Sequence, residues 1–469
     1  RNKKRKEEKF MKKAHDLGND NVLKLVIILA VPSMVAQLIS VLYNIVDRMF
    51  IGNIPVIGAA ALAGVGVCGP IVTLLTSFGT LIGLGGSIMM AMSMGEGNLE
   101  KAKNIMSNSF LSLIVLSISL TALFLFFKDT LIMGFGASAQ TFPYANTYLT
   151  IYTWGTVFAL MATGLNYFIT CQGFAAVGML TVTLGAVSNI VLDAVFVYVF
   201  KWGVAGAAIA TVISQFLSCA FAFAFLLNKH VPIRISLGGY ELKIIRKILS
   251  IGLSPFLIIA TDSVIAIAIN VILKAKGGSD SDLLISAAAI VQSYMLLITG
   301  PLIGISGGTQ AIISYNYGAG KTDRIKLAEK YIVILALILT TSMFIVTRLF
   351  PDFFVSFFTD DKVLAAVTVW GINTFTLAII PLSFQYCFVD ALTAMGKIKT
   401  ALCLSMNRKS IYIICTVLFP VFYSAKSVFF AQPVADIISA VVSSTVFFII
   451  FERHLKKRKE RVMAELQEI

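Results

Sequence analysis

Polar residues that could hold a cation occur at helical spacing within apolar stretches of this chain. Asn189 and Asp193 are four residues apart in the run NIVLDAVF, so a helix places both side chains on one face. Asp47 and Thr211 lie in two other apolar stretches, and Thr211 follows Ala207 by four residues. Hard cations prefer carboxylate, amide and hydroxyl oxygens, and two neighbouring carboxylates repel each other unless they share a proton. The pattern predicts a site for H⁺ or Na⁺ if the helices bring these groups together.

The alternative reading is structural. An isolated Asn or Thr in a membrane helix usually contributes to helix–helix contact, worth about 0.6 kcal/mol. Asp47 is followed by Arg48, so these two could form a local ion pair at a membrane surface. If the helices cross a membrane alternately, however, Asp47, the 189/193 pair and the 207/211 pair all lie towards the outer ends of their spans. This shared depth favours a cation site, with a possible Na⁺ held by Asp47, Asn189, Asp193 and Thr211.

The second half of the chain also carries charges within apolar stretches. Asp390 and Arg408 lie at similar depth on either side of the short segment 396–399, which predicts a buried ion pair. A substrate or proton site open to the cytoplasm is the alternative for these two residues. Asp262 and Asp436 lie near the middle of their spans and could either meet lipophilic cations in a cavity or be structural.

Several other kinds of chemistry are excluded by residue type. The three histidines, at 15, 230 and 454, lie outside the apolar stretches, so an intramembrane histidine relay or metal site is not expected. The chain has no HExxH, GxSxG or Walker A motif, so we expect neither an enzyme nor ATP-driven transport, and no cofactor. The six cysteines show no CxxC spacing and are interpreted as small buried apolar residues.

The elements that must position these residues are membrane-spanning helices. The chain is 58% hydrophobic and 13% charged, whereas soluble domains are about 25% charged, and its mean hydropathy is +0.88. Apolar stretches of about 20 residues or more, long enough to cross a bilayer, recur along the chain. We therefore expect an all-α polytopic membrane protein with twelve spans, at 23–51, 59–92, 104–127, 145–171, 177–200, 203–227, 247–273, 284–316, 326–350, 363–395, 400–423 and 427–451.

Basic residues indicate which side of the membrane is which. The termini and the loops on their side carry 28 Lys and Arg, and the opposite loops carry 7. By the positive-inside rule, both termini are expected to be cytoplasmic. The net charge of +14 does not indicate nucleic-acid binding, because the basic residues lie between apolar runs and are not interleaved with aromatic residues.

The two halves of the chain repeat one another. The segment FGTLIGLGGSIMMAMSMGEG, at 78–97, matches TGPLIGISGGTQAIISYNYGAG, at 299–320, and CQGFAAVG at 171–178 resembles VDALTAMG at 389–396. Six spans separate the copies, so two six-helix lobes should be related by a pseudo-two-fold axis along the membrane normal. The expected domains are a cytoplasmic basic arm (1–22), an N-terminal lobe (23–227), a cytoplasmic linker (228–246), a C-terminal lobe (247–452) and a cytoplasmic basic tail (453–469).

Four segments together resemble a known family: LAVPSMVAQLISVLYNIVDRMFIG, SNIVLDAVF, VAGAAIATVISQ and GGTQAIISYNYGAG. Over almost its whole length the chain resembles the multidrug and toxic compound extrusion (MATE) transporters of bacterial type. The resemblance implies that Asp47, Asn189, Asp193, Thr211 and the carbonyl of Ala207 bind a monovalent cation. Related bacterial members often carry Glu where this chain has Asp262, so a cation role is less secure in the second lobe.

The resemblance implies a secondary active multidrug efflux antiporter in the bacterial cytoplasmic membrane. It would export cationic amphipathic compounds in exchange for H⁺ or Na⁺ by alternating access, as a monomer and without a nucleic-acid partner. One alternative is a lipid-linked oligosaccharide flippase of the same superfamily, which would need a basic cavity, although only Arg408 and Lys409 are intramembrane candidates. Another is a non-transporting membrane receptor or scaffold, which would not need repeated lobes.

Overall fold

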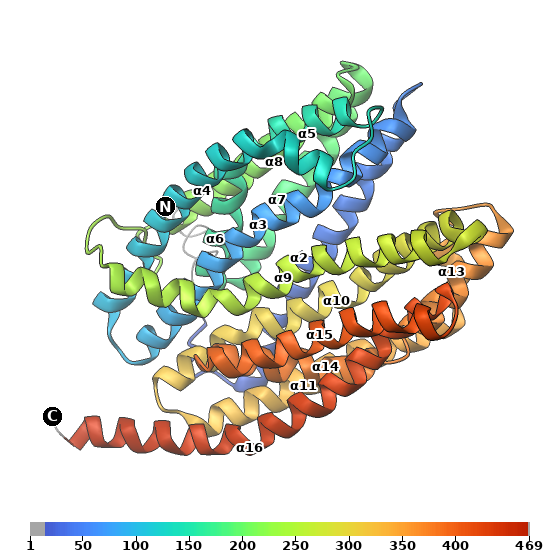
Figure 1. The fold of residues 1–469 in the computed structure, drawn as a ribbon. Coiled ribbons are helices and arrows are strands. Elements are labelled where there is room, and N and C mark those ends of the chain that lie inside the picture. Colours follow the sequence, from blue (N-terminus) through green and yellow to red (C-terminus); the bar gives the residue numbers. More distant parts are fainter. Residues whose placement is uncertain (1–14, 468–469) are drawn as a thin grey trace.

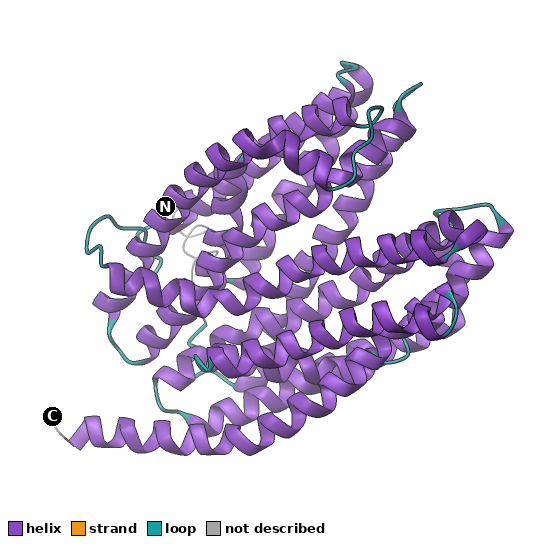
Figure 2. Ribbon diagram, viewed as in Figure 1, coloured by secondary structure: helices purple, strands orange, loops and turns teal. Residues whose placement is uncertain are grey.

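The computed structural model describes residues 15–467, and in that range all regular secondary structure is helical (Figure 2). The first half contains α2 (Val22–Gly52), α3 (Gly58–Gly95), α4 (Leu99–Gly134), α5 (Phe142–Trp154), α6 (Thr156–Thr170), α7 (Ala175–Asp193), the π-helical turn η1 (Ala194–Val199) and α8 (Gly203–Leu226). The second half contains α9 (Leu242–Lys276), η2 (Gly278–Asp280), α10 (Ser281–Gly318), α11 (Thr322–Leu349), α12 (Pro351–Val355), α13 (Lys362–Phe375), α14 (Ile379–Ala394), α15 (Ile398–Phe422), η3 (Ala425–Phe430) and α16 (Ala431–Gln467).

The helices are long enough to make this a multi-pass membrane protein. In the described residues, ten helices are long and apolar enough to cross a membrane, and α13 with α14 makes an eleventh crossing bent by 50°. The twelfth is α5 with α6, which are separated only by Gly155. The predicted all-α architecture of twelve spans in two lobes is therefore confirmed.

Two predicted spans, 145–171 and 363–395, are interrupted, which the apolar pattern did not predict. At Gly155 the chain passes so close to α8 that a Cβ would lie 2.5 Å from Cγ2 of Val212. Between α13 and α14 the helix stops at Thr376, and Pro381 follows in the first turn of α14. Pro381 has no N–H to bond the carbonyl four residues earlier, so it cannot contribute that hydrogen bond to a continuous helix and favours a break here.

The two halves form two lobes that lie side by side (Figure 1). Helices α2 to α8, blue to green, make the first lobe, and α9 to α16, lime to red, make the second. The lobes meet mainly along three helix pairs, α2 with α10, α3 with α9 and α3 with α10. In Figure 1 they converge towards the end at which α16 finishes and separate towards the end that carries α13. We call the first the basic end, because the loops rich in Lys and Arg lie there, and the second the far end.

Glycines allow the lobes to touch backbone to backbone towards the basic end. A Cβ on Gly318 of α10 would lie 2.1 Å from the Met92 carbonyl of α3, and one on Gly95 would lie 1.9 Å from the Tyr315 carbonyl. Further along α10, a Cβ on Gly304 would lie 2.5 Å from Cα of Met34 on α2. Real Cβ atoms do not approach backbone this closely, so any side chain at these glycines would push the lobes apart.

Charged side chains add contacts between the lobes at the basic end. Arg458 of α16 donates to the Gly318 carbonyl at 2.6 Å and to Oε1 of Glu96, after α3, at 3.1 Å. Ahead of α2, the Leu17 carbonyl accepts from Nδ2 of Asn316 at 2.9 Å, which ties the first lobe to α10. The region predicted as a tail from residue 453 is thus a continuation of α16 that contacts both lobes.

Candidate functional site

The five residues predicted to hold a cation lie near the far ends of three helices in the first lobe. Asp47 is in the last turns of α2, and Asn189 and Asp193 close α7. A turn in which Lys201 and Gly203 both have a φ of 56° reverses the chain. Ala207 and Thr211 therefore lie in the first turns of α8, beside the end of α7. Since α7 packs against both α2 and α8, the three helix faces converge.

The side chains meet as the spacing predicts. Nδ2 of Asn189 donates to the hydroxyl of Thr211 over 3.4 Å, and that hydroxyl donates to the Ala207 carbonyl at 3.0 Å. The carboxyl groups of Asp47 and Asp193 face each other closely enough to hydrogen-bond if they share a proton. The structure thus brings the five residues together, and cation binding by them stays a prediction.

Several oxygens of this cluster are buried without a hydrogen-bond partner. Asp193 is completely buried, Asn189 is 1% exposed and Asp47 is 8% exposed. Oδ1 of Asp47, Oδ1 of Asn189 and both carboxylate oxygens of Asp193 have no donor among the described residues. The alternative interpretation of Asp47 was a local ion pair with Arg48, but the described residues contain no such pair. Unpaired carboxylates are costly to bury, so the cluster is suited to a proton or a metal cation.

The surroundings of the cluster include features that were not predicted. The π-helical turn η1 begins directly after Asp193, and such turns occur often at functional sites. Tyr43 precedes Asp47 by one helical turn and Tyr148 of α5 reaches Thr211, so both phenol groups lie near the carboxyl pair. Helical spacing from Asp47 could have identified Tyr43, but no sequence signal linked Tyr148 to the cluster.

The predicted ion pair between Asp390 and Arg408 is wrong. Nε of Arg408 donates instead to Oδ1 of Asp436 at 2.8 Å, and the Asp436 side chain is completely buried. Gln432, one turn before Asp436 on α16, also donates to both of its carboxylate oxygens. The prediction used only the depth of Arg408 in the membrane, which matches that of Asp390. Depth does not determine which face of α15 carries Arg408, and in the structure this face packs on α16.

Asp262 is also paired. Its Oδ1 accepts from Nζ of Lys409, which is almost fully buried, while 57% of the Asp262 side chain is exposed. Both Asp262 and Asp436 therefore carry a basic partner, and neither offers an unpaired negative charge to a lipophilic cation. Asp390 interacts with Ser306 and Gln310 of α10 rather than with a basic residue. Glu329 of α11, which was not predicted, lies near enough to Asp390 for the two charges to interact.

No group of three or more His, Cys, Asp or Glu suited to a metal ion occurs between residues 15 and 467. All six cysteines are free, and four of them are buried. A transition-metal centre is therefore not part of the described structure.

Comparisons with known proteins identify the family. The MatE family model matches residues 32–195 and 259–418. The multidrug export protein MepA of Staphylococcus haemolyticus is 24% identical over 412 residues, which cover 87% of this chain and 88% of that protein. MepA of Staphylococcus aureus strain NCTC 8325 is 22% identical over 439 residues, 92% of this chain and 95% of that protein.

Solved structures share the fold. A multidrug resistance MATE family transporter of the MOP superfamily, in an outward-facing conformation, superposes with a TM-score of 0.87 at 22% identity, covering 94% of this chain and 98% of that one. A MOP superfamily transporter from Pyrococcus furiosus, described as having a binding pocket of reverse polarity, has a TM-score of 0.87 at 21% identity, covering 93% and 98%. The family model spans well over half of the chain, so this protein belongs to the MatE family of membrane transporters.

Proposed function

We propose that this chain is a secondary active multidrug exporter that moves cationic amphipathic compounds out of the cell in exchange for H⁺ or Na⁺. The observation that carries the proposal is the set of buried, unpartnered oxygens on Asp47, Asn189 and Asp193. No hydrogen-bond donor satisfies these atoms in the described structure, and a bound proton or cation would compensate them. The names of the staphylococcal relatives support multidrug export as the activity.

The proposed orientation places the basic end in the cytoplasm. It follows from the excess of Lys and Arg in the loops at that end. The chain would then lie in the bacterial cytoplasmic membrane with both termini inside, and would work as a monomer because one chain contains both lobes.

In this orientation the lobes are closed on the cytoplasmic side by the glycine contacts around Gly95 and Gly318. The cluster at Asp193 lies near the far, outer end. A cation arriving from outside would bind there and favour one arrangement of the lobes, to the extent that it binds that arrangement more tightly. Release of the cation to the cytoplasm would then accompany the change that reloads the exporter with drug.

A flippase for lipid-linked oligosaccharides is disfavoured by the second lobe. Arg408 and Lys409, the intramembrane basic side chains considered above, each form an ion pair with an acid. Neither is free to hold a pyrophosphate group. Because these ion pairs leave the second lobe without an unpaired basic group, amphipathic compounds of modest charge are more compatible with it than a pyrophosphate is.

The test is gradient-driven efflux from vesicles containing the purified chain, with ethidium as the probe. An inward Na⁺ gradient and an inward H⁺ gradient are imposed separately, and each is collapsed by an ionophore as control. Efflux under one gradient, lost on its collapse, identifies the coupling ion. Absence of efflux under both gradients would contradict the proposal and favour a non-transporting protein.

A further inference from the structure

A large open cavity lies at the far end of the second lobe, beside the connection between α15 and α16. Its volume is about 820 Å³, which is within the range of about 300–1,000 Å³ that small-molecule sites occupy. It is lined by α13, the end of α15, the segment that includes η3 and the first turn of α16. We call it the far-end cavity.

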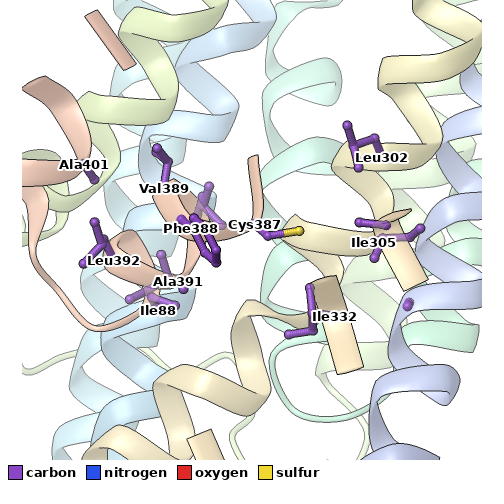
Figure 3. Close-up of a cluster of buried hydrophobic side chains, with 14 of the residues drawn as sticks. Ile88, Leu302, Ile305, Ile332, Cys387, Phe388, Val389, Ala391, Leu392 and Ala401 are labelled. Carbon is purple, nitrogen blue, oxygen red and sulfur yellow. The ribbon is translucent and has the colours of Figure 1, made fainter. Parts of the chain in front are cut away.

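The cavity follows from the bend between α13 and α14. Helix α14 packs on α10, α11 and α16, and Figure 3 shows Cys387 of α14 pointing towards Ile305 of α10, with Ile332 of α11 close by. Helix α13 diverges from this packed helix by 50°. The divergence leaves a space between α13 and the end of α15, and the far-end cavity occupies it.

The far-end cavity is separate from the interface between the lobes. Gly371 of α13 faces α10, because a Cβ there would lie 3.0 Å from Cγ2 of Val291. Ala366 and Trp370, which are four residues apart, share another face of α13 and line the cavity. Among the described residues, none of the first lobe, α9 or α10 lines it. The cavity is therefore distinct from the cluster at Asp193 and from the helices through which the lobes meet.

Most of the cavity wall is apolar or aromatic. Trp370, Phe419, Tyr423 and Phe430 all contribute to it. Trp370 is 38% exposed and Tyr423 is 78% exposed, and these two residue types are enriched where a bilayer meets water. Since α15 and α16 cross the membrane on either side of this connection, the cavity lies at the boundary between headgroups and lipid chains.

The polar edge of the cavity carries a single charge. Lys426 is exposed and forms no ion pair in residues 15–467. Ser424 and Ser427 line the cavity beside it. Ser427 donates to the Ser424 carbonyl through its amide at 2.9 Å and through its hydroxyl at 2.6 Å, which fixes the turn that carries Lys426. An ammonium group next to a hydroxyl suits a phosphate, because both donate hydrogen bonds to its oxygens.

The first lobe does not build this polar edge. Its equivalent connection, between its fifth and sixth spans, contains only residues 200–202. The rings of Phe196, Phe200 and Trp202 pack on one another there, with centroids 5.0 to 5.8 Å apart. In the second lobe the connection covers residues 423–430. A lobe of this architecture thus forms with the short connection, so the longer segment that carries Lys426 is not required by the fold.

The two parts of the cavity together indicate an amphipathic anion. No Asp or Glu of the described chain lines the cavity, so it offers no partner to the cationic compounds proposed for export or to the positive group of a zwitterionic headgroup. A free phosphate ion would leave the aromatic wall uncovered. A phospholipid with a net negative charge satisfies both the lysine and the wall.

We propose that the far-end cavity binds an anionic phospholipid of the surrounding membrane, with its phosphate at Lys426 and its chains against Trp370 and Phe419. The site goes beyond the proposed function, because its ligand is an anion of the bilayer and not an exported cation. Its occupancy depends neither on the coupling ion nor on drug export.

The test measures fluorescence of Trp370 in the full chain reconstituted into vesicles. The chain has three tryptophans, so Trp154→Phe/Trp202→Phe leaves Trp370 as the only one. Brominated phospholipids quench tryptophan on contact. Vesicles of phosphatidylcholine receive increasing fractions of brominated phosphatidylglycerol in one series and of brominated phosphatidylcholine in the other. The ratio of the two quenching curves gives the relative affinity of the anionic lipid.

Three variants are compared in this background. Lys426→Gln removes the positive charge of the site. Lys362→Gln is the matched control, because Lys362 is an exposed lysine at the start of α13 that does not line the cavity. Ala366→Phe fills the space beside Trp370 and leaves the charge in place.

We expect the anionic lipid to bind at Trp370 about five-fold more tightly than phosphatidylcholine, as one lysine near a membrane surface provides. Lys426→Gln should abolish this preference, Lys362→Gln should retain it, and Ala366→Phe should reduce quenching by both lipids. Equal affinity for the two lipids would show a space filled by any bilayer lipid and would overturn the proposal. A preference that persists in Lys426→Gln, or quenching that Ala366→Phe leaves unchanged, would overturn it as well. Because no transport is measured, failure of drug efflux would leave this result intact.

Discussion

Asp193 faces Asp47 across the contact between α7 and α2, and neither carboxylate oxygen of Asp193 has a hydrogen-bond partner in the described structure. Two buried acids without a base are unfavourable unless a cation or a proton compensates them.

Gly318→Val should prevent the lobes from closing at the basic end. The added side chain meets the Met92 carbonyl, 2.1 Å from a Cβ at this position, so the arrangement open at this end becomes more populated. The reporter is the native Cys171, which is buried and lines the cavity between the lobes. Its labelling by a water-soluble maleimide, followed by peptide mass spectrometry, should rise several-fold. Gly66→Ala is the matched control, because a Cβ there meets nothing within 4 Å; equal labelling in both variants would refute the closure.

Arg408→Met alone should destabilise the second lobe more than the double variant Arg408→Met/Asp436→Leu. Removing one partner leaves the other charge buried and unpaired, which costs about 3–5 kcal/mol, whereas an apolar pair is often neutral. The free energy of unfolding in mixed detergent, measured as a double-mutant cycle, checks this. A loss in the double variant equal to the sum of the losses in Arg408→Met and Asp436→Leu would show that the 2.8 Å contact between Arg408 and Asp436 contributes no coupling.

Arg458→Ala should loosen the basic end more than Glu96→Gln. Arg458 bonds the Tyr317 and Gly318 carbonyls at 2.9 and 2.6 Å as well as Glu96. A partly exposed ion pair is worth only about 0.2–1 kcal/mol, so Glu96→Gln removes the smaller part. Maleimide labelling of Cys171 should increase in Arg458→Ala and change little in Glu96→Gln, and the reverse order would contradict the assignment.

Asp16 should stabilise the turn before α2 at neutral pH but not in acid. The Asn19 side chain donates to its carboxylate at 2.8 Å, and the Gly18 amide does so at 2.9 Å. These bonds hold the pKa of Asp16 below its usual value, with the Asn19 contact as the main cause. The stabilisation is complete above the pKa of the unfolded chain and disappears as the pH falls through the lower folded value. Hydrogen exchange at residues 17–19 should be faster in Asp16→Asn than in wild type at pH 7, and the difference should vanish in strong acid; a difference independent of pH would contradict it.

The cluster at Asp193 could be anticipated from sequence because it rests on regular features. Residues four apart share a helix face, and alternate crossing of the membrane sets their depth, so Asn189, Asp193 and Thr211 were predicted to converge and do so. The twelve spans follow from the lengths of the apolar stretches in the same way. Depth alone does not give the rotation of a helix, which is why Arg408 was assigned to Asp390 rather than to Asp436.

Glu329 falls at the start of the predicted span 326–350 but was missed because it lies within the charged segment KTDRIKLAEK, at 321–330, which was interpreted as part of a loop. The structure begins α11 at Thr322, and Ile325, Ala328, Glu329 and Ile332 form its buried face. That spacing is the helical period, so an amphipathic reading of 322–332 would have placed Glu329 on the apolar side. The break at Gly155 depends on a contact between helices, which composition does not report, whereas Pro381 is itself a sequence signal for the break before α14.

We propose that the carboxyls of Asp47 and Asp193 bind the cation that drives export. The most direct measurement is gradient-driven ethidium efflux from vesicles that contain equal amounts of wild type, Asp193→Asn or Asp360→Asn. Asp360 is an exposed loop residue, so its variant is the matched control for loss of one carboxylate. We expect Asp193→Asn to abolish efflux and Asp360→Asn to retain the wild-type rate. Full efflux by a folded Asp193→Asn protein would contradict it.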